Sequence, residues 1–565
     1  MNSIKEQKGA RLERFRQLYS EARAAAEGRI SDMHSYMDQY LGAAAIDGST
    51  EAASYVRNIT FEIIESEIDP NVPYPKADTT LAESKRLSNA AMIERLCRSV
   101  RERLPFEELN DRDERYTYVY GASVWYVEWD ESLRFSNELG GVRVHCLPPT
   151  DFIGQPGISE VEDMEYCFLK FTTTRDELVR RYGVKEEELS LADIEYEYGE
   201  GGSGSDTVSV ITAYYKDDDG EIGCFIFSGS LVLTDQPRFY KRKVAHCKEC
   251  GAYFGQCECK DSEKVYKELT HERVNSSLEP ETFGEILIPY YTPRSYPIVI
   301  RRNTRTEKSP FGISDCMIMR PQQQAINKVE SRILKKLIRA GIFPILPEDS
   351  SISASNTVFG EIIRMRQGES ADNYGKLDTT PDIRNDILEA DRLYDQAKRV
   401  IGISDALQGT DTSLNESGYA RELKINRATS RLETKKRIKY HTYSRLYELI
   451  FRHYLAFFDR TEATFSESGG IRASFDRYAF IEPDTDGGLS FADDYLFSVD
   501  LDNGSEYGRS LLWQKNLENL ESGALGDKEH PRTLLRYWRS QEKAHYPFAR
   551  ENVEYLEAIL KERKD

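Results

Sequence analysis

Apolar residues recur every three or four positions in two stretches near the middle of the chain, the spacing of a helix with one buried face. The first stretch begins at Pro321, which suits the first turn of a helix, and ends before Gly341, which suits the position just after one. Its apolar face comprises Ile326, Val329, Ile333 and Leu337. The second stretch carries Ile383, Ile387, Ala390, Tyr394, Ala397 and Ile401. The pattern therefore predicts two helices, over 319–340 and 382–402.

Residues 341–381, between these helices, lose the helical spacing. The segments GIFPIL and VFGEIIRMR are apolar and separated by Ser-rich turns, so they predict short strands. A polar segment, GTDTSLNESG, begins at Gly409, and helical spacing then continues from about Tyr419 to Phe458. At about 1.5 Å per residue that helix is roughly 60 Å long. A helix of this length needs neighbours along its whole extent.

The order of helical and strand patterns predicts an α+β fold. Helical patterns precede residue 120, and the prolines of DPNVPYPKAD interrupt them. Alternating, aromatic segments from about 116 to 235 predict one small antiparallel sheet, with Gly121 at a bulge or bend. Within it, the capping box from Thr174 to Glu177 and the stop at Gly183 predict one helix. The remaining predictions are helices over 4–41, 51–68, 81–104 and 107–120, extended chain over 286–302, short strands over 463–502, and two or three amphipathic helices over 506–565.

Composition limits the class of protein. A chain of 565 residues with 39% hydrophobic and 11% aromatic residues folds into several domains, each large enough to bury a core. The net charge of −20 argues against a protein that coats DNA, because phosphate binding needs a basic surface. No segment has the roughly 18 consecutive apolar residues of a membrane helix, and the charged N-terminus has no signal-peptide core. We expect a soluble, cytoplasmic protein.

The nine cysteines fall into two groups. Five are isolated in apolar settings and are predicted to be buried: Cys97, Cys146, Cys167, Cys224 and Cys316. The other four lie in HCKECGAYFGQCECK, where C-x-x-C faces C-x-C across a short loop: Cys247, Cys250, Cys257 and Cys259. Four thiolates brought together in this way bind Zn²⁺ tetrahedrally, and His246 can replace one of them. A structural zinc site is favoured over a disulfide, which a reducing compartment disfavours, and over a redox site.

Candidate chemistry is otherwise sparse. The sequence contains no phosphate-binding G-x-x-x-x-G-K-[ST] loop, no H-E-x-x-H and no G-x-S-x-G, and its many carboxylates form no distinctive cluster. We therefore expect a protein that is not an enzyme.

Basic residues are concentrated on the central helices. Arg332, Lys335, Lys336 and Arg339 lie near the end of the first helix, where they complement the helix dipole. A second run covers 421–439, in the first half of its helix, where the dipole gives no reason for it. Ion pairing between subunits and transient contact with DNA are the two interpretations of this run.

The chain resembles the portal proteins of tailed bacteriophages. The resemblance rests on YGASVWYVEWD, LPPTDFIGQPG and TTTRDELVRRYG, then on SPFGISDCMIMRPQQQAINKVESRI and NESGYARELKINRA. It covers nearly the whole chain, through architecture and loose local patterns rather than one invariant motif.

The resemblance implies a ring, typically a dodecamer, at one capsid vertex, through which double-stranded DNA is packaged and ejected. Its partners would be the terminase large subunit, a head-tail adaptor, and the major capsid and scaffold proteins. The protein would reside in the virion after assembly in the host cytoplasm, with no membrane partner. The implied subdomains are a wing (1–318, with the zinc-knuckle insertion at 241–262), a stem (319–340 and 382–402), a clip (341–381), a tunnel loop and long wing helix with return strands (403–505), and a crown (506–565).

The resemblance also implies roles for individual residues. The DNA channel would be lined by Thr410, Asp411, Thr412, Ser413 and Asn415 of the tunnel loop and by Arg332, Lys335, Lys336 and Arg339 of the stem. Docking at the clip would involve Phe343, Ile345, Val358, Ile362 and Arg364. The zinc knuckle is not general in the family, so it is interpreted as a stabilised projection of the wing. The alternatives are another capsid-assembly interaction protein and a zinc-ribbon enzyme that processes nucleic acids.

Overall fold

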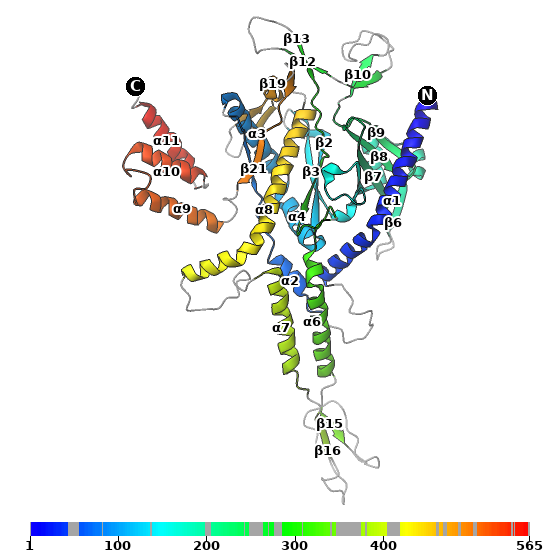
Figure 1. Cartoon of the computed structure of the whole chain (residues 1–565), viewed down its shortest axis with the longest axis vertical. Coiled ribbons are helices and arrows are strands. Elements are labelled where there is room, and N and C mark those ends of the chain that lie inside the picture. Colours follow the sequence, from blue (N-terminus) through cyan, green and yellow to red (C-terminus); the bar gives the residue numbers. More distant parts are fainter. Residues whose placement is uncertain are drawn as a thin grey trace, which may run out of the picture. The chain divides into compact units, whose positions relative to one another are not determined.

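The computed structural model is a mixed helix and strand protein of the α+β class, and every described strand pair is antiparallel (Figure 1). Two compact units are present, unit 1 (1–31, 68–313 and 433–565) and unit 2 (32–67 and 314–432). The residues that the structure describes are 2–42, 56–81, 83–135, 138–197, 205–241, 243–247, 264–268, 271–275, 285–307, 309–338, 342–345, 375–378, 381–403, 418–458, 463–466, 472–483, 488–500, 506–543, 546 and 548–562.

Most of the predicted helices are confirmed, including all three at the C-terminal end. The α-helices are α1 (Asn2–Leu41), α2 (Ile59–Glu65), α3 (Ser84–Arg103), α4 (Phe106–Tyr120), α5 (Arg175–Tyr182), α6 (Asp315–Ile338), α7 (Arg384–Ile401), α8 (Gly418–Phe457), α9 (Glu506–Glu521), α10 (Pro531–Lys543) and α11 (Ala549–Glu562). The capping box is also confirmed in part, since the Thr174 hydroxyl accepts from the Glu177 amide and Gly183 ends α5 in the left-handed region. None of the described helices is both long and apolar enough to cross a membrane.

The predicted start of the helix at Pro321 is wrong. Helix α6 begins at Asp315, and its N-terminus is capped by Ser314, whose hydroxyl accepts from the Met317 amide at 3.4 Å. Pro321 therefore lies inside the helix, where its ring disfavours the helical backbone. Burial of Cys316 and Met319 in the preceding turns offsets that cost.

The prediction of a helix over 51–68 is too long. Among the described residues of that range, α2 begins only at Ile59, because the Asn58 side chain accepts from the Phe61 amide and sets the N-cap. The proline-rich segment that follows ends this helix and also contains a strand. Tyr74–Asp78 forms strand β1, in which Pro75 is tolerated because the two-stranded ladder leaves an open edge.

The structure builds two sheets where the sequence predicts one between 116 and 235. A three-stranded sheet has the order β14-β2-β3, and a six-stranded sheet has the order β4-β5-β7-β8-β9, with β6 paired to β7. The division follows from β14, which comes late in the chain and pairs with β2 in the register Ile300↔Val124. Of the two predictions for Gly121, the bend is confirmed and the bulge is wrong, because this residue ends α4 at φ 90°.

The strands have the following bounds: β1 (Tyr74–Asp78), β2 (Ala122–Phe135), β3 (Glu138–Leu147), β4 (Phe152–Gly154), β5 (Tyr166–Thr174), β6 (Asp193–Glu197), β7 (Ser205–Lys216), β8 (Ile222–Ser228), β9 (Leu231–Gln236), β10 (Lys243–Cys247), β11 (Lys264–Glu268), β12 (His271–Asn275), β13 (Glu285–Pro289), β14 (Ile298–Arg302), β15 (Ile342–Ile345), β16 (Gly375–Asp378), β17 (Ala463–Ser466), β18 (Arg472–Phe475), β19 (Ile481–Pro483), β20 (Leu489–Phe491) and β21 (Leu496–Asp500).

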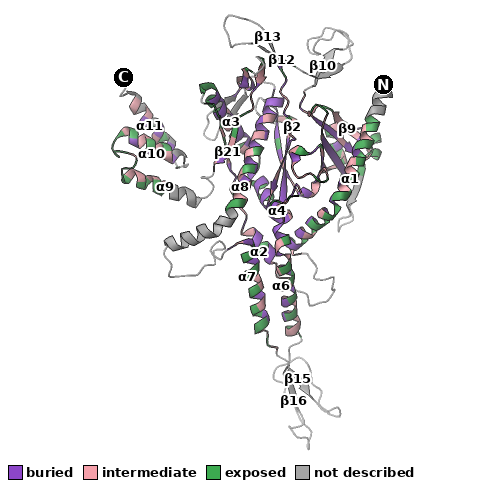
Figure 2. Cartoon of the chain, viewed as in Figure 1, coloured by how far each residue is buried: buried purple, intermediate pink, exposed green. Residues whose placement is uncertain are grey.

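The second half of α8 is the centre of the unit 1 core (Figure 2). Tyr443, Tyr447 and Phe451 are fully buried on this helix. The ring of Tyr443 meets Trp125 of β2 at 5.4 Å, and that of Tyr447 meets Phe106 of α4 at 6.3 Å. The second half of α8 therefore packs against neighbours from its own chain.

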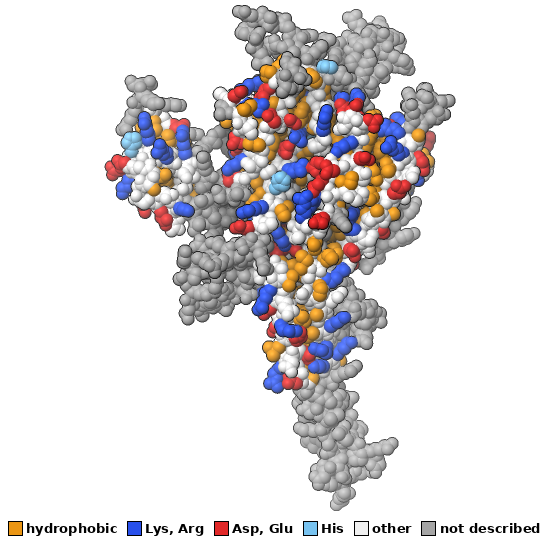
Figure 3. Space-filling model, viewed as in Figure 1, with side chains coloured by type: hydrophobic (Ala, Val, Ile, Leu, Met, Phe, Trp, Pro, Cys, Tyr) orange, Lys and Arg blue, Asp and Glu red, His pale blue; other side chains and the backbone are white. Residues whose placement is uncertain are grey.

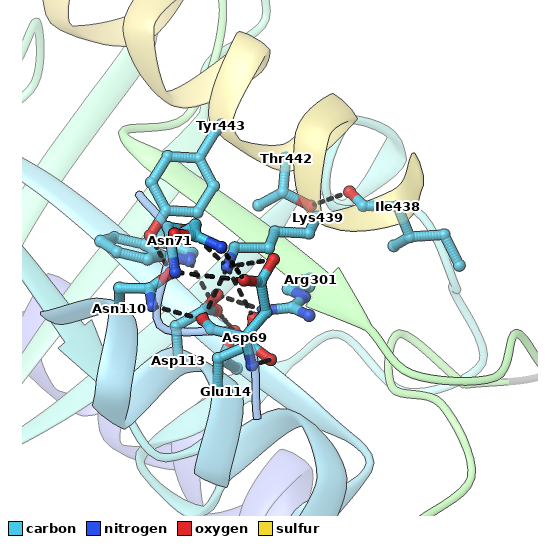
Figure 4. Close-up of polar contacts among 12 residues, drawn as sticks. Asp69, Asn71, Asn110, Asp113, Glu114, Arg301, Ile438, Lys439, Thr442 and Tyr443 are labelled. Carbon is cyan, nitrogen blue, oxygen red and sulfur yellow. Dashed lines mark hydrogen bonds and ion pairs between the residues drawn. The ribbon is translucent and has the colours of Figure 1, made fainter. Parts of the chain in front are cut away.

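A buried charge network joins this half of α8 to α4 and β14 (Figure 4). The Lys439 ammonium lies 3.1 Å from Glu114 Oε1 and 3.4 Å from Asp69 Oδ2, and it also donates to the Asn71 carbonyl at 2.8 Å. The Lys439 side chain has no exposed surface. Its assignment to an outward-facing basic run over 421–439 is therefore wrong: its charge is used inside the subunit.

Arg301 completes the same network. Its guanidinium lies 2.5 Å from Asp113 Oδ2 and 2.7 Å from Glu114 Oε1. Burial opposes the charged form of Glu114, but the Arg301 and Lys439 charges outweigh it and lower the pKa of this carboxyl. Asp113 also accepts from the Trp125 indole at 2.9 Å. Each charge is thus matched by a partner, as burial requires.

The five isolated cysteines are free and buried, as predicted. Burial raises the pKa of Cys224 and of Cys316 to about 12, which keeps both thiols protonated.

Candidate functional site: the α6–α7 helix pair

Helices α6 and α7 of unit 2 lie side by side and run in opposite directions (Figure 1). A narrow apolar seam holds them together, formed by the buried Val329, Ile333 and Ala390, with Ile383 and Leu393 at its margin. All of these residues except Leu393 belong to the faces that the helical spacing predicts. Leu337 and Ile387, which the same spacing places on those faces, are instead exposed. The seam is therefore too short to fix the pair by apolar burial alone.

Arg57 joins the two helices at one level. Its guanidinium lies 3.5 Å from Glu330 of α6 and 3.7 Å from Asp391 of α7. It also covers the ring of Tyr394, at 5.2 Å from the ring centre, and the Tyr394 hydroxyl bonds to Glu62 of α2. One arginine before α2 thus contacts a carboxylate on each helix and the Tyr394 ring.

A buried hydrogen-bond network explains one residue of the PQQQ sequence in α6, Gln323. The Gln39 side-chain amide donates to the Thr60 hydroxyl at 3.0 Å, and the Thr60 amide donates to Gln323 Oε1 at 3.1 Å. Gln323 Nε2 in turn donates to the Arg57 carbonyl at 2.7 Å and to Asn327 Oδ1 at 2.8 Å. Because buried polar groups must be paired, this network fixes α1, α2 and α6 in one arrangement.

Asp386 binds the pair together nearer the other end. The carboxylate accepts from Lys336 at 2.5 Å and from Arg332 at 2.6 Å, both on α6. The hydrogen bond from Lys336, together with the charge of Arg332, lowers the pKa of Asp386. Asp386 lies in the first turn of α7, where the helix dipole also favours a negative charge.

The predicted DNA-channel residues are placed only in part. Arg332 and Lys336 share Asp386, so one of their two positive charges is balanced within the subunit, and Lys335 lies partly buried between them on α6. The remaining predicted channel residues lie outside the described part of the chain: Arg339, Thr410, Asp411, Thr412, Ser413 and Asn415.

The predicted clip is likewise seen only at its ends. GIFPIL is confirmed as strand β15, in which Phe343 pairs with Leu377 and Ile345 with Gly375 of β16. The strand β16 was not predicted, because GKLD has a single apolar residue. Val358, Ile362 and Arg364, with the rest of VFGEIIRMR, lie outside the described residues.

The cysteine knuckle is flanked by a strand pair. β10 and β11 are antiparallel, with His246 opposite Val265 and Cys247 opposite Lys264, so residues 248–263 connect two paired ends. Cys250, Cys257 and Cys259 are outside the described residues. Within the part of the chain that the structure covers, no three His, Cys, Asp or Glu side chains are placed to hold a metal ion.

Sequence reasoning missed the residues that hold the helix pair together, namely Asp386, Arg57, Gln39 and Thr60. Asp386 had a usable signal, as an acidic residue in a first helical turn. Arg57 and Gln39 had none, because Glu330 and the Cys316 carbonyl, to which Gln39 also donates, lie hundreds of residues away from them along the chain.

No family model matches this sequence, and no curated protein is significantly similar to it.

Proposed function

We propose that the chain is one subunit of a tailed-phage portal, a ring through which double-stranded DNA is packaged and ejected. The observation that carries the proposal is the α6–α7 pair itself, with the β15–β16 strand pair between its helices in the sequence and the long α8 after it. This order agrees with the stem, clip and wing helix that the resemblance implies. In this role the protein has no catalytic step of its own.

Exposed apolar side chains support an oligomer. Half of the large hydrophobic side chains that are exposed among the described residues belong to the smaller unit 2. They are Leu41, Phe61, Met317, Leu337, Ile338, Ile387, Leu388 and Val400. Such a concentration on a small unit indicates a surface that another protein covers.

The charge distribution suits a channel that does not hold its DNA. With a net charge of −20 the chain repels phosphates, and Asp386 cancels one of the two positive charges of Arg332 and Lys336. We expect transient phosphate contact there and docking of the terminase and adaptor at the clip, around Phe343 and Ile345. The capsid and scaffold proteins would contact the rest of the ring.

Native mass spectrometry and electron microscopy of the purified full-length protein test the proposal. We expect a closed ring of about twelve copies, with a central opening wide enough for a duplex. A monomer or dimer at every concentration would contradict a portal. A large assembly without a closed ring would instead favour another capsid-assembly protein.

We propose further that Cys247, Cys250, Cys257 and Cys259 bind one structural Zn²⁺. The antiparallel β10–β11 pair supports this, because it fixes both ends of the segment that carries the thiols. Freshly purified protein should contain about one zinc per chain, since four thiolates hold zinc tightly. Cys250→Ser should lose most of that zinc, whereas Cys224→Ser, a change of a buried cysteine outside the knuckle, should keep it. Protein without zinc would refute the site.

A further inference from the structure

The outward faces of α6 and α7 are defined by their exposed positions, and Figure 3 shows charged side chains of both signs along the pair. On α6 the exposed positions follow helical spacing through Met317, Pro321, Gln324, Lys328 and Arg332. On α7 they follow the same spacing through Leu388, Asp391, Asp395 and Arg399. The exposed face of α6 therefore carries basic side chains along its middle, and the exposed face of α7 carries acidic side chains there.

Contacts within the pair show which positions share a level. Asp386 meets both Arg332 and Lys336, so it lies level with the turn between them. Since the helices run in opposite directions at about 1.5 Å per residue, Lys328 lies level with the turn of α7 between Asp391 and Asp395. The shared contacts of Arg57 with Glu330 and Asp391 agree with this register.

Exposed apolar side chains lie on both helices at the end of the pair where α6 finishes and α7 begins. Leu337 and Ile338 close α6, and Ile387 and Leu388 lie in the first turns of α7, all between 44% and 66% exposed. At the opposite end Val400 of α7 and Pro321 of α6 are close to one level and both exposed. At about 100° per residue, Leu337 lies on the side of α6 opposite Lys328, so these apolar side chains do not all belong to the outward faces.

We infer that α6 of one copy packs against α7 of the next copy, with Lys328 facing Asp395. In a ring whose rotation axis runs along the helix pair, residues at the same height on neighbouring copies lie opposite each other. Lys328 of one copy and Asp395 of the next then have opposite charges. A two-fold dimer through either face would instead bring like charges together. Arg392 does not oppose this pairing, because it binds Glu389 on its own helix at 2.6 Å. The inference rests on the proposed ring and adds which two faces build it.

Exchange of the two charges tests the inference. Lys328→Glu and Asp395→Lys should each weaken association by about fivefold per contact, an effect repeated at every contact of the ring. The double variant Lys328→Glu/Asp395→Lys should assemble like the unchanged protein. An equimolar mixture of the two single variants should also assemble, because every contact in an alternating ring then joins opposite charges.

Native mass spectrometry at matched concentration and moderate salt measures ring and monomer in each sample. Lys515→Glu, on the exposed surface of α9, is the control of equal charge change and should assemble normally. Circular dichroism should show unchanged folding, because both substituted side chains are exposed. If the single variants form as much ring as the unchanged protein, these two faces do not meet. The same conclusion follows if neither the double variant nor the mixture forms rings again. If the unchanged protein forms no ring, the proposed function itself fails.

Discussion

Replacing Lys439 with methionine is expected to lower the free energy of unfolding by about 3–5 kcal/mol, because it removes one partner of a fully buried ion pair. Methionine keeps the apolar stem and volume but leaves Glu114 and Asp69 in the core with one cation fewer. Urea unfolding followed by tryptophan fluorescence measures the loss, since Trp125 lies in the same network.

Arg437→Met is the matched control, since Arg437 is exposed on the same helix and should change stability by less than about 0.5 kcal/mol. Adding Glu114→Gln to Lys439→Met should cost less than the sum of the two single changes, because the neutral amide no longer requires the missing cation. Equal effects of Lys439→Met and Arg437→Met would show that the Lys439 charge is not held in the core.

The second large effect is a loss of stability in acid that depends on His453. This side chain is fully buried on α8, where Nδ1 donates to the Leu449 carbonyl at 2.8 Å and Nε2 has no partner. Burial lowers its pKa to about 4 from 6.5. In the unfolded chain His453 therefore binds a proton below about pH 6.5, whereas in the folded chain it binds one only below about pH 4.

Stability from this residue is complete above pH 6.5 and falls as the pH drops towards 4, by about 3 kcal/mol in total. His453→Phe should reduce the difference in unfolding free energy between pH 7 and pH 4 by that amount. The ring contacts with Tyr240 and Phe457 accept a phenyl group at this position. His441→Gln, a change of an exposed histidine on the same helix, should leave the difference unchanged. Parallel stability curves for the unchanged protein and His453→Phe would exclude this role.

Local signals predicted most elements. Helices α7 and α8, the Thr174 cap and the five buried cysteines follow from spacing, capping chemistry and apolar context, which act over a few residues. The start of α6 was missed because Pro321 is a strong local signal, whereas the Ser314 cap gains its importance from the burial of Cys316 and Met319. That burial depends on residues distant in sequence.

Charges were the least predictable feature. Lys439 lies in a run of basic residues that looks solvated, yet it is buried, because its carboxylate partners come from residues 69 and 114. Arg332 and Lys336 were predicted to face DNA without any account of Asp386. The charge of a basic side chain can be read from the sequence, but its ion-pair partner is determined by the fold.

The two ends of the α6–α7 pair differ in how dissolved ions act on them. Asp386 holds Arg332 and Lys336 by charge, and both cations are partly open to solvent, so mobile ions screen this end within a Debye length of about 8 Å at physiological ionic strength. The Gln39, Thr60 and Gln323 network is buried and uncharged, and screening does not touch it. Rising ionic strength should therefore separate the helices first at the Asp386 end while their base stays closed.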